Sequence, residues 1–243
     1  SRFKNLHNFK VLLEGESEEN FLDDNLQPDD IFLNMYTSGT MGTPKCVQLT
    51  HGNILSQQAA LKKLWDLDER DRFLSYLPWH HSFGGIFEKF SALSNGATMT
   101  LEPSYGKSAE SILSLWGNVK PTVFFSVPKV YSSLFELIKN DPDAERIFFH
   151  PELKFIFTAA AALPQRLSDE FEKRGIPVLE GWGLTETSPC CSLTNPELKR
   201  EPGLVGMPIP GVEIRIADDD EIQVKGPNVM VSYYKNDQAN KDI

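Results

Sequence analysis

The sequence predicts an α/β protein in which a mainly parallel sheet is wrapped by helices and is followed by the start of a small β-rich lobe. From residue 31 onward, short apolar runs alternate with stretches of helical period. Several of these runs are almost continuously apolar, as expected for strands that are covered on both faces. After residue 194, two short runs instead alternate apolar and polar residues.

The predicted strands of the parallel sheet are apolar runs of four to six residues. They are Ile31–Tyr36, Phe73–Leu77, Ala97–Leu101, Thr122–Phe125, Leu153–Phe157 and Ile176–Leu179. Three stretches between them predict helices. Asn53–Trp65 and Pro128–Asn140 place apolar residues largely on one side. Pro164–Arg174 begins with proline and stops before Gly175, which is the usual asymmetry of helix ends.

The last part of the chain predicts a hairpin. Val212–Ile216 and Glu221–Lys225 alternate in period two around the turn at Asp218–Asp220. We therefore expect three regions: an acidic connector over residues 1–30, a central α/β subdomain over 31–194, and the start of a β-rich subdomain over 195–243.

Charge and cysteine content limit the classes of function. Of the 34 acidic residues, eight lie between Glu14 and Asp30, and the remaining 26 nearly balance 24 basic residues. A nucleic-acid polymer is an unexpected partner, because the sequence has no basic stripe. The three cysteines form no CxxC pair and favour a reducing, cytoplasmic setting. No apolar run approaches the roughly 18 residues of a membrane-spanning helix; peripheral contact with the inner membrane surface stays open.

The stretch "MYTSGTMGTPK", from Met35 to Lys45, follows the first predicted strand and has the composition of a phosphate-binding loop. Its glycines let backbone N–H groups approach phosphate oxygens, its hydroxyls donate further hydrogen bonds, and Lys45 supplies a cation. It is not a P-loop, since Lys45 follows Pro44, and Cys46 stands where that motif has Ser or Thr. On this stretch alone, a polar turn between strand and helix is an equal alternative.

A second loop, "LEGWGLTETSP" from Leu179 to Pro189, follows the last predicted strand. Trp182 between two glycines offers a face for a flat heterocycle, although a tryptophan is more often part of a core. Glu186 is a suitable ligand for Mg²⁺, which usually takes one or two carboxylates plus substrate phosphates. Two loops at the carboxyl ends of strands are expected to meet over one crevice of an open sheet.

Together with the stretches around them, these loops resemble the motifs of the adenylate-forming enzymes: acyl-CoA synthetases, luciferases and peptide-synthetase adenylation domains. "YTSGTMGTPK" resembles the family signature and "GWGLTET" its second core motif. "LPWHHSFG", "TAAAALP", "GLVGMPIPG" and "EIQVKGPNVMVSYYKN" follow in family order. The resemblance covers most of residues 30–242, and is nearest to bacterial fatty acyl-CoA ligases.

The resemblance implies that ATP and Mg²⁺ bind the central subdomain, where a carboxylic acid, expected to be a fatty acid, becomes an acyl-adenylate before transfer to coenzyme A. The residues that it implies for the β- and γ-phosphates are Thr37, Ser38, Gly39, Thr40, Gly42, Thr43 and Lys45. Thr185 would contact the α-phosphate, Glu186 would bind Mg²⁺, and His81 would lie near the reacting carboxylate. Gly181, Trp182 and Gly183, with Ala160 behind them, would form the adenine slot.

The chain departs from the family pattern at Cys46 and Ser232, which replace glycines, and in the alanines of "TAAAALP". We expect these changes to alter the shape of the pocket and not its chemistry. A fatty chain needs an apolar tunnel, for which Phe87, Phe90, Phe124 and Phe125 are candidates, although ordinary core packing is the commoner role of such residues.

Several alternatives stay open at this point. The chain could load another carboxylic or amino acid onto a carrier-protein thiol, or bind a nucleotide without catalysis. His81 is as readily a structural histidine, and zinc at His80–His81 is disfavoured because neighbouring side chains on a strand point apart. Family members extend beyond both ends of this chain, so we expect an N-terminal lobe and a C-terminal domain to be missing and the chain alone to be nearly inactive.

Overall fold

Two sheets and one separate hairpin make up the β structure of the residues that the structure describes. The computed structural model describes residues 25–37, 44–159, 161–195, 201 and 203–241. The larger sheet has the strand order β4-β3-β5-β6-β7-β8-β9, and the smaller one has the order β1-β2-β12. The larger sheet contains β3 (Arg72–Ser75), β4 (Thr98–Leu101), β5 (Val123–Ser126), β6 (Phe155–Thr158), β7 (Val178–Trp182), β8 (Ser192–Leu193) and β9 (Met207–Pro208). The smaller sheet contains β1 (Ile31–Thr37), β2 (Lys45–Thr50) and β12 (Ser232–Tyr233).

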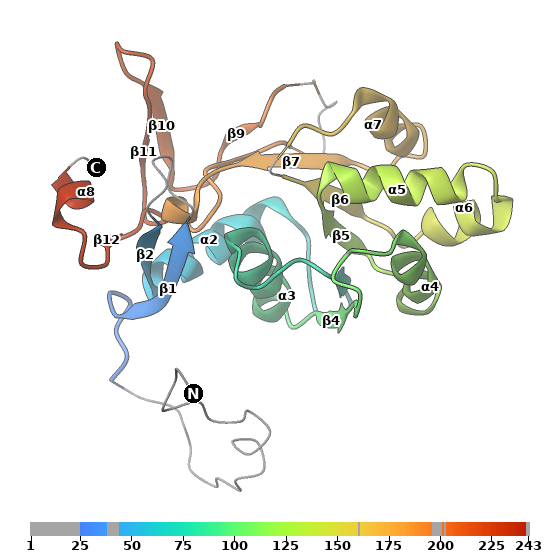
Figure 1. Ribbon diagram of the computed structural model, residues 1–243, viewed down its shortest axis with the longest axis horizontal. Helices are drawn as coiled ribbons and strands as arrows, with labels where there is room; N and C mark the ends of the chain where they lie inside the picture. Colours follow the sequence, from blue (N-terminus) through green and yellow to red (C-terminus); the bar gives the residue numbers. More distant parts are fainter. Residues whose placement is uncertain (1–24, 38–43, 160, 196–200, 202, 242–243) are drawn as a thin grey trace, which may run out of the picture.

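Helices surround the larger sheet (Figure 1). They are α2 (His51–Leu64), α3 (Lys89–Ser94), α4 (Ala109–Val119), α5 (Pro128–Ile138), α6 (Pro142–Phe148) and α7 (Gln165–Glu172), with a π-helix η1 (Phe83–Glu88) and a 3₁₀ turn η2 (Thr185–Thr187). The helix α8 (Asp237–Lys241) instead lies beside β12 of the smaller sheet. The strands β4, β3, β5, β6 and β7 run parallel, while β8 and β9 are antiparallel additions. The prediction of an α/β fold with a mainly parallel sheet is confirmed.

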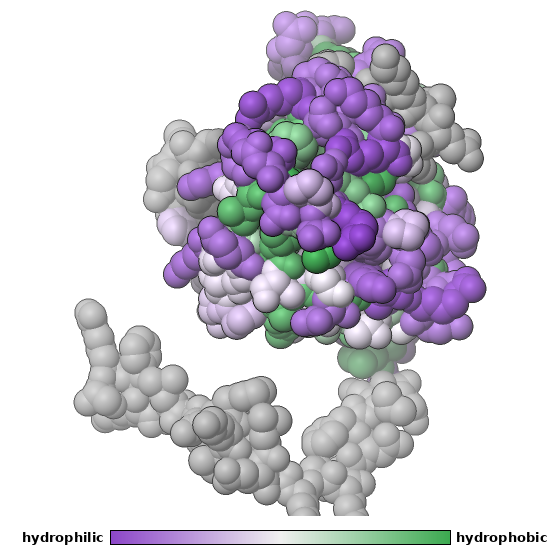
Figure 2. All heavy atoms as spheres, turned by 90° about the vertical axis from the view of Figure 1, so that its right-hand side faces the viewer, coloured by the Kyte–Doolittle hydropathy of each residue, from purple (hydrophilic) through white to green (hydrophobic). Residues whose placement is uncertain are grey.

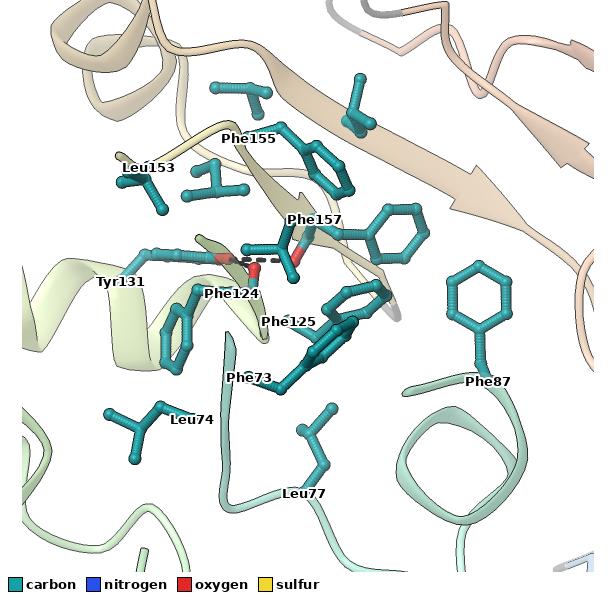
Figure 3. Close-up of a cluster of buried hydrophobic side chains, with 14 of the residues drawn as sticks. Phe73, Leu74, Leu77, Phe87, Phe124, Phe125, Tyr131, Leu153, Phe155 and Phe157 are labelled. Atoms are coloured by element: carbon teal, nitrogen blue, oxygen red, sulfur yellow. Dashed lines mark hydrogen bonds between the residues drawn. The ribbon is translucent and has the colours of Figure 1, made fainter. Parts of the chain in front are cut away.

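The core lies on both faces of the parallel strands (Figure 3). On one face, Phe125 and Phe157 pack against each other, with ring centroids 5.1 Å apart, and both contact Phe87 of η1. On the other face, Phe124 packs against Trp116 of α4 at 4.8 Å. Side chains of β5 therefore alternate between two helical layers, which explains why its sequence is apolar throughout and why all four of its residues are buried.

The first predicted strand belongs to a different sheet from the one expected. β1 pairs antiparallel with β2, so the stretch between Thr37 and Lys45 joins two strands of the smaller sheet and does not join a strand to a helix. The sequence did not predict a strand over Lys45–Thr50, because its alternation of apolar and polar residues is short and the next helix begins directly after it. Thr50 caps α2: its hydroxyl accepts from the Asn53 N–H, and the Asn53 side chain accepts from the Thr50 N–H.

The chain after residue 194 contributes to both sheets. β9 adds to the larger sheet and β12 pairs with β2 in the smaller one. The predicted hairpin is present as β10 (Glu213–Ile216) and β11 (Ile222–Lys225), which pair antiparallel and stand apart in Figure 1. A division of the chain at residue 194 stays a prediction.

The surface at the end of the molecule near α6 is mostly hydrophilic, with apolar side chains showing only in small areas (Figure 2). None of the helices in the described ranges has the length and apolar character needed to cross a bilayer.

Candidate functional site

A cavity of about 900 Å³ lies where β6 and β7 end beside the first two strands of the smaller sheet. Lys45 at the start of β2 and Glu186 in η2 both line it, as the convergence of the two loops requires. The predicted site residues that line this cavity are Thr37, Lys45, His81, Gly181, Trp182, Gly183, Thr185 and Glu186. Ser38, Gly39, Thr40, Gly42, Thr43 and Ala160 lie outside the described residues.

The two glycines of the second loop are required by close packing of the chain. A Cβ atom on Gly183 would lie 1.8 Å from the carbonyl oxygen of Pro189, which is backbone and cannot turn aside. A Cβ atom on Gly181 would lie 2.8 Å from the Leu193 side chain. The glycines thus allow β7 and the following turn to fold closely against residues 189–193, with Trp182 presented between them at the cavity wall.

The buried side-chain amide of Asn228 holds the turn that carries Thr185 and Glu186. Asn228 is 1% exposed, and its side chain donates to the carbonyl oxygens of Thr187 and Cys190, both at 3.0 Å. The Ser188 hydroxyl in turn donates to the Asn228 carbonyl at 2.8 Å. Because these groups are buried, their hydrogen bonds fix the turn against a segment some forty residues later in the chain.

Glu186 and Lys45 are linked by one aromatic side chain. The Tyr233 hydroxyl donates to Oε1 of Glu186 at 2.8 Å, and Nζ of Lys45 lies 4.7 Å from the centre of the Tyr233 ring. Burial, and next the neighbouring Glu186 carboxylate, raise the pKa of Tyr233, so its hydroxyl remains a donor at neutral pH. In the described part of the chain, no other hydrogen bond reaches the Glu186 carboxylate, which leaves Oε2 available to a ligand.

A divalent ion fits this site only if a ligand supplies further oxygens. No three His, Cys, Asp or Glu side chains converge anywhere in the described ranges. One carboxylate with a free oxygen beside a cation matches the way that Mg²⁺ binds together with phosphates, because Mg²⁺ needs few protein ligands.

His81 and Thr185 both line the cavity. The Thr185 hydroxyl is 3.3 Å from the Ser82 hydroxyl, to which it donates, so η2 contacts the segment that precedes η1. The Phe83 N–H donates to Nδ1 of His81 at 3.2 Å, which orients the ring. Partial burial, and next the neighbouring His80, lower the pKa of His81, so the imidazole is neutral at pH 7.

The inner end of the cavity is apolar. Phe83 and Phe87 of η1 and Phe157 of β6 line it, and Phe157 lies 5.0 Å from Phe87 and 5.8 Å from Phe83, centre to centre. Other apolar side chains of the lining are more exposed, with Leu204 at 54% and Val205 at 41%; among them are Ala159, Ala161, Ala162, Leu204 and Val205.

Three of the four phenylalanines named as candidates for a tunnel pack in the core, which was the commoner role expected for them. Phe124 and Phe125 are 0% exposed and pack within the core, since β5 is covered on both faces. Phe90 packs against a second cluster, beside the smaller sheet. Of the four, Phe87 alone lines the cavity.

Sequence reasoning assigned no role to three polar residues of the site. Tyr233 lies in a stretch that the family resemblance includes, but nothing local indicates that it reaches Glu186. Ser82 follows His81 directly, and this adjacency is the local signal that points to it. Thr158 ends β6 at the cavity wall, and its hydroxyl has no hydrogen-bond partner among the described residues.

Comparisons with known proteins show the family of this chain. The sequence pattern that describes AMP-binding enzymes matches residues 5–234. The chain belongs to the AMP-binding enzyme family. Malonate–CoA ligase of Arabidopsis thaliana is 31% identical over 93% of this AMP-binding chain and 39% of its own length. The long-chain-fatty-acid–CoA ligase of Bacillus subtilis (strain 168) is 30% identical over 95% of this chain and 42% of its own length.

A solved structure shares the fold. The O-succinylbenzoate coenzyme A synthetase of Bacillus subtilis in complex with ATP and magnesium ion superimposes with a TM-score of 0.81 at 29% identity, over 96% of this chain and 49% of that one. This AMP-binding chain therefore spans less than half the length of each of these relatives.

Proposed function

We propose that this AMP-binding enzyme is part of an ATP-dependent acyl-CoA synthetase that activates an apolar, fatty carboxylic acid. The observation that carries the proposal is the shared cavity, in which a lysine and a carboxylate are joined through Tyr233. A cation and a metal-binding carboxylate at one site match the polyphosphate tail of a magnesium nucleotide. The malonate, fatty-acid and succinylbenzoate relatives are named as CoA ligases or synthetases, which supports the same class.

The proposed reaction has two steps. A carboxylate oxygen of the acid attacks the α-phosphorus of ATP; a new O–P bond forms, and the bond to the β-phosphate oxygen breaks to release pyrophosphate. The sulfur of coenzyme A then attacks the acyl carbon; a C–S bond forms, AMP leaves with the bridging oxygen, and the thiol proton passes to solvent. Both steps move negative charge between oxygens, so placed charges and donors are the main source of rate.

The polar end of the cavity would bind the phosphates. Lys45 and Thr37 lie at the two ends of the signature loop, and we assign them, with Ser38, Gly39, Thr40, Gly42 and Thr43, to the β- and γ-phosphates. Thr185 would donate to the α-phosphate, and Glu186 would hold Mg²⁺ through Oε2. Bound there, Mg²⁺ would neutralise charge on the phosphate oxygens.

The other assignments follow from position in the same cavity. Gly181, Trp182 and Gly183 would form the adenine slot with Ala160, since the glycine backbone leaves space beside the indole. His81 borders both the apolar wall and Ser82, so we place it next to the carboxylate of the acid. Its neutral imidazole adds no charge that would hold that carboxylate away from phosphorus.

The cavity favours an acid with one carboxylate. Among the described lining residues, Lys45 is the only Lys or Arg. The buried side chains of Phe83, Phe87 and Phe157 form the wall at the inner end of the cavity. A second carboxylate, as in malonate, would be buried there without a cation, which is costly. An apolar acyl group would gain free energy from the same wall.

Nucleotide binding tests the assignment of the polar end. Calorimetry with ATP, with and without Mg²⁺, is expected to show binding that Mg²⁺ strengthens. Lys45→Ala should weaken binding about tenfold, because a charge-assisted contact is lost. Glu186→Gln should remove most of the increase in ATP affinity that Mg²⁺ causes in wild type. Lys63→Ala, at an exposed lysine of α2, is the control. If wild type binds no ATP, or if both variants match it, the assignment is wrong.

Stable mimics of the acyl-adenylate test which acid the site prefers, and they do so without requiring catalytic turnover. Acyl-sulfamoyl adenosines with fatty, malonyl, aromatic and amino-acyl groups would compete against labelled ATP. We expect the fatty analogues to bind best and the malonyl analogue worst. Preference for an amino-acyl group would indicate a carrier-loading enzyme, and equal affinity for all of them would indicate a nucleotide-binding module without an acid site.

A further inference from the structure

We propose that Tyr233 is a positioning residue that holds Glu186 for the divalent ion and supports Lys45 beside the phosphates. The inference rests on the proposed function and adds to it a residue from a distant part of the chain. Its basis is the pair of contacts that Tyr233 makes: a 2.8 Å hydrogen bond to Oε1 of Glu186 and a ring face 4.7 Å from Nζ of Lys45.

The backbone around Tyr233 is fixed from two sides. β12 pairs with β2 so that Tyr233 lies opposite Val47, and the Tyr234 N–H donates to the Cys46 carbonyl at 2.8 Å. On the other side, the Asn240 side chain accepts from the Tyr233 N–H at 2.7 Å and donates to its carbonyl at 3.0 Å. The side chain is 6% exposed, so little freedom remains for the ring.

The backbone of Glu186 is fixed from the same segment. The Met230 N–H donates to the Glu186 carbonyl at 2.8 Å, three residues before Tyr233. The backbone and the carboxylate of Glu186 are thus both held by residues 230–233. A carboxylate that is already oriented loses less entropy when a metal binds, and hydrogen-bonded partners of this kind commonly change metal affinity by 10–100-fold.

The ring and the hydroxyl of Tyr233 serve different parts of the site. The hydroxyl contacts the carboxylate, while the ring face contacts the ammonium group, an attraction that does not need the hydroxyl. Removing the hydroxyl oxygen alone should therefore weaken binding of the metal ion and leave Lys45 in place. Removing the ring should weaken metal binding and also displace Lys45. The difference between these two substitutions separates a positioning role of the hydroxyl from general packing of the side chain.

The experiment measures the affinity of the full 243-residue chain for ATP, in excess Mg²⁺ and in EDTA. Tyr233→Phe is expected to weaken binding about tenfold in Mg²⁺ and to leave binding in EDTA unchanged. Tyr233→Leu should weaken binding in both conditions. Tyr234→Phe is the matched control, since Tyr234 is 48% exposed and has no assigned contact in the cavity, and it should bind like wild type.

A double variant tests whether the hydroxyl acts through Glu186. In a Glu186→Gln background, Tyr233→Phe should cause little further loss, because the carboxylate that it positions is gone. Circular dichroism and thermal denaturation establish that each variant is folded. Tyr233→Leu keeps the inference testable if the phenylalanine variant is unstable, because the inference requires its loss in Mg²⁺ to exceed its loss in EDTA.

The possible failures are distinguishable. Wild-type chain that shows no Mg²⁺-dependent ATP binding would overturn the proposed function and this inference together. Wild-type binding that depends on Mg²⁺, with Tyr233→Phe equal to wild type in both conditions, would overturn the role of Tyr233 alone. An equal loss for Tyr233→Phe in Mg²⁺ and in EDTA would also overturn it, since this indicates a change in packing.

Discussion

The buried carboxyl of Glu88 is expected to make the stability of the protein depend on pH. Glu88 ends η1 and is 0% exposed. The Ser75 hydroxyl donates to its Oε2 at 2.6 Å, and its Oε1 has no partner among the described residues. Burial raises the pKa of Glu88 from 4.5 to about 8, while the Ser75 hydrogen bond opposes the shift. Glu88 is therefore protonated in the folded protein at neutral pH.

The sign and size of the effect follow from this pKa. Between pH 4.5 and about 8, the folded state holds a proton that the unfolded state releases, so the free energy of unfolding falls as pH rises. Each pKa unit corresponds to about 1.4 kcal/mol, so the loss by pH 7 is about 3 kcal/mol. Glu88→Gln has nearly the same shape, accepts from Ser75 and needs no proton. It should be more stable than wild type at pH 7 by about this amount, or roughly 6–12 °C in Tm.

Urea denaturation of wild type and Glu88→Gln at about pH 5 and about pH 7.5 measures this difference. The free energy of unfolding of Glu88→Gln should exceed that of wild type by more as pH rises, and the two values should be nearly equal at the lower pH. Glu69→Gln, at an exposed position, is the control and should show no such divergence. The reasoning is refuted if the difference between wild type and Glu88→Gln stays constant with pH, or if the variant is less stable at the higher pH.

Two further substitutions test the architecture of the site. Gly183→Ala should destabilise the protein by at least about 2 kcal/mol and abolish ATP binding, because its Cβ would collide with the Pro189 carbonyl. The control is Gly117→Ala in α4, which should be neutral or stabilising because the added Cβ would have no contact closer than 3.4 Å. Equal Tm values for the two variants would contradict the predicted collision at Gly183. Asn228→Ala should cost about 1–3 kcal/mol, because the buried Thr187 carbonyl loses its donor, whereas the Cys190 carbonyl keeps a hydrogen bond from the Gln57 side chain. An unchanged Tm in thermal denaturation would show that these hydrogen bonds do not hold the turn.

Local patterns predicted the parallel strands well. The run at Val123–Ser126 is apolar because both of its faces are covered, and continuous apolar runs of this length have few other structures available. Local patterns missed short elements, and they also missed α4, which has eleven residues, as many as α5. β2 was missed because six residues leading into a helix give little period to detect, and α6 was missed because seven residues make barely two turns.

For the candidate site, motif and spacing placed eight predicted residues in one cavity, including Lys45 and Glu186. The same reasoning named Phe124 and Phe125 as candidates for an apolar tunnel but could not separate that role from core packing, and both belong to the closed core. A phenylalanine in a strand has the same local pattern whether its neighbours are side chains or a ligand, so only packing distinguishes the two.

The sequence by itself determined which residue types stand at the turns: hydroxyls, glycines and Lys45 in one stretch, and Trp182 with Glu186 in another. These are local choices, set by backbone freedom and by the chemistry of phosphate and metal. The tertiary structure decided which turns meet. Glu186 reaches Tyr233, whose ring faces Lys45, because β12 pairs with β2, and pairing over such separations depends on the packing of the whole chain. No local propensity encodes that pairing, so the residue that links the two halves of the site became visible only in the folded protein.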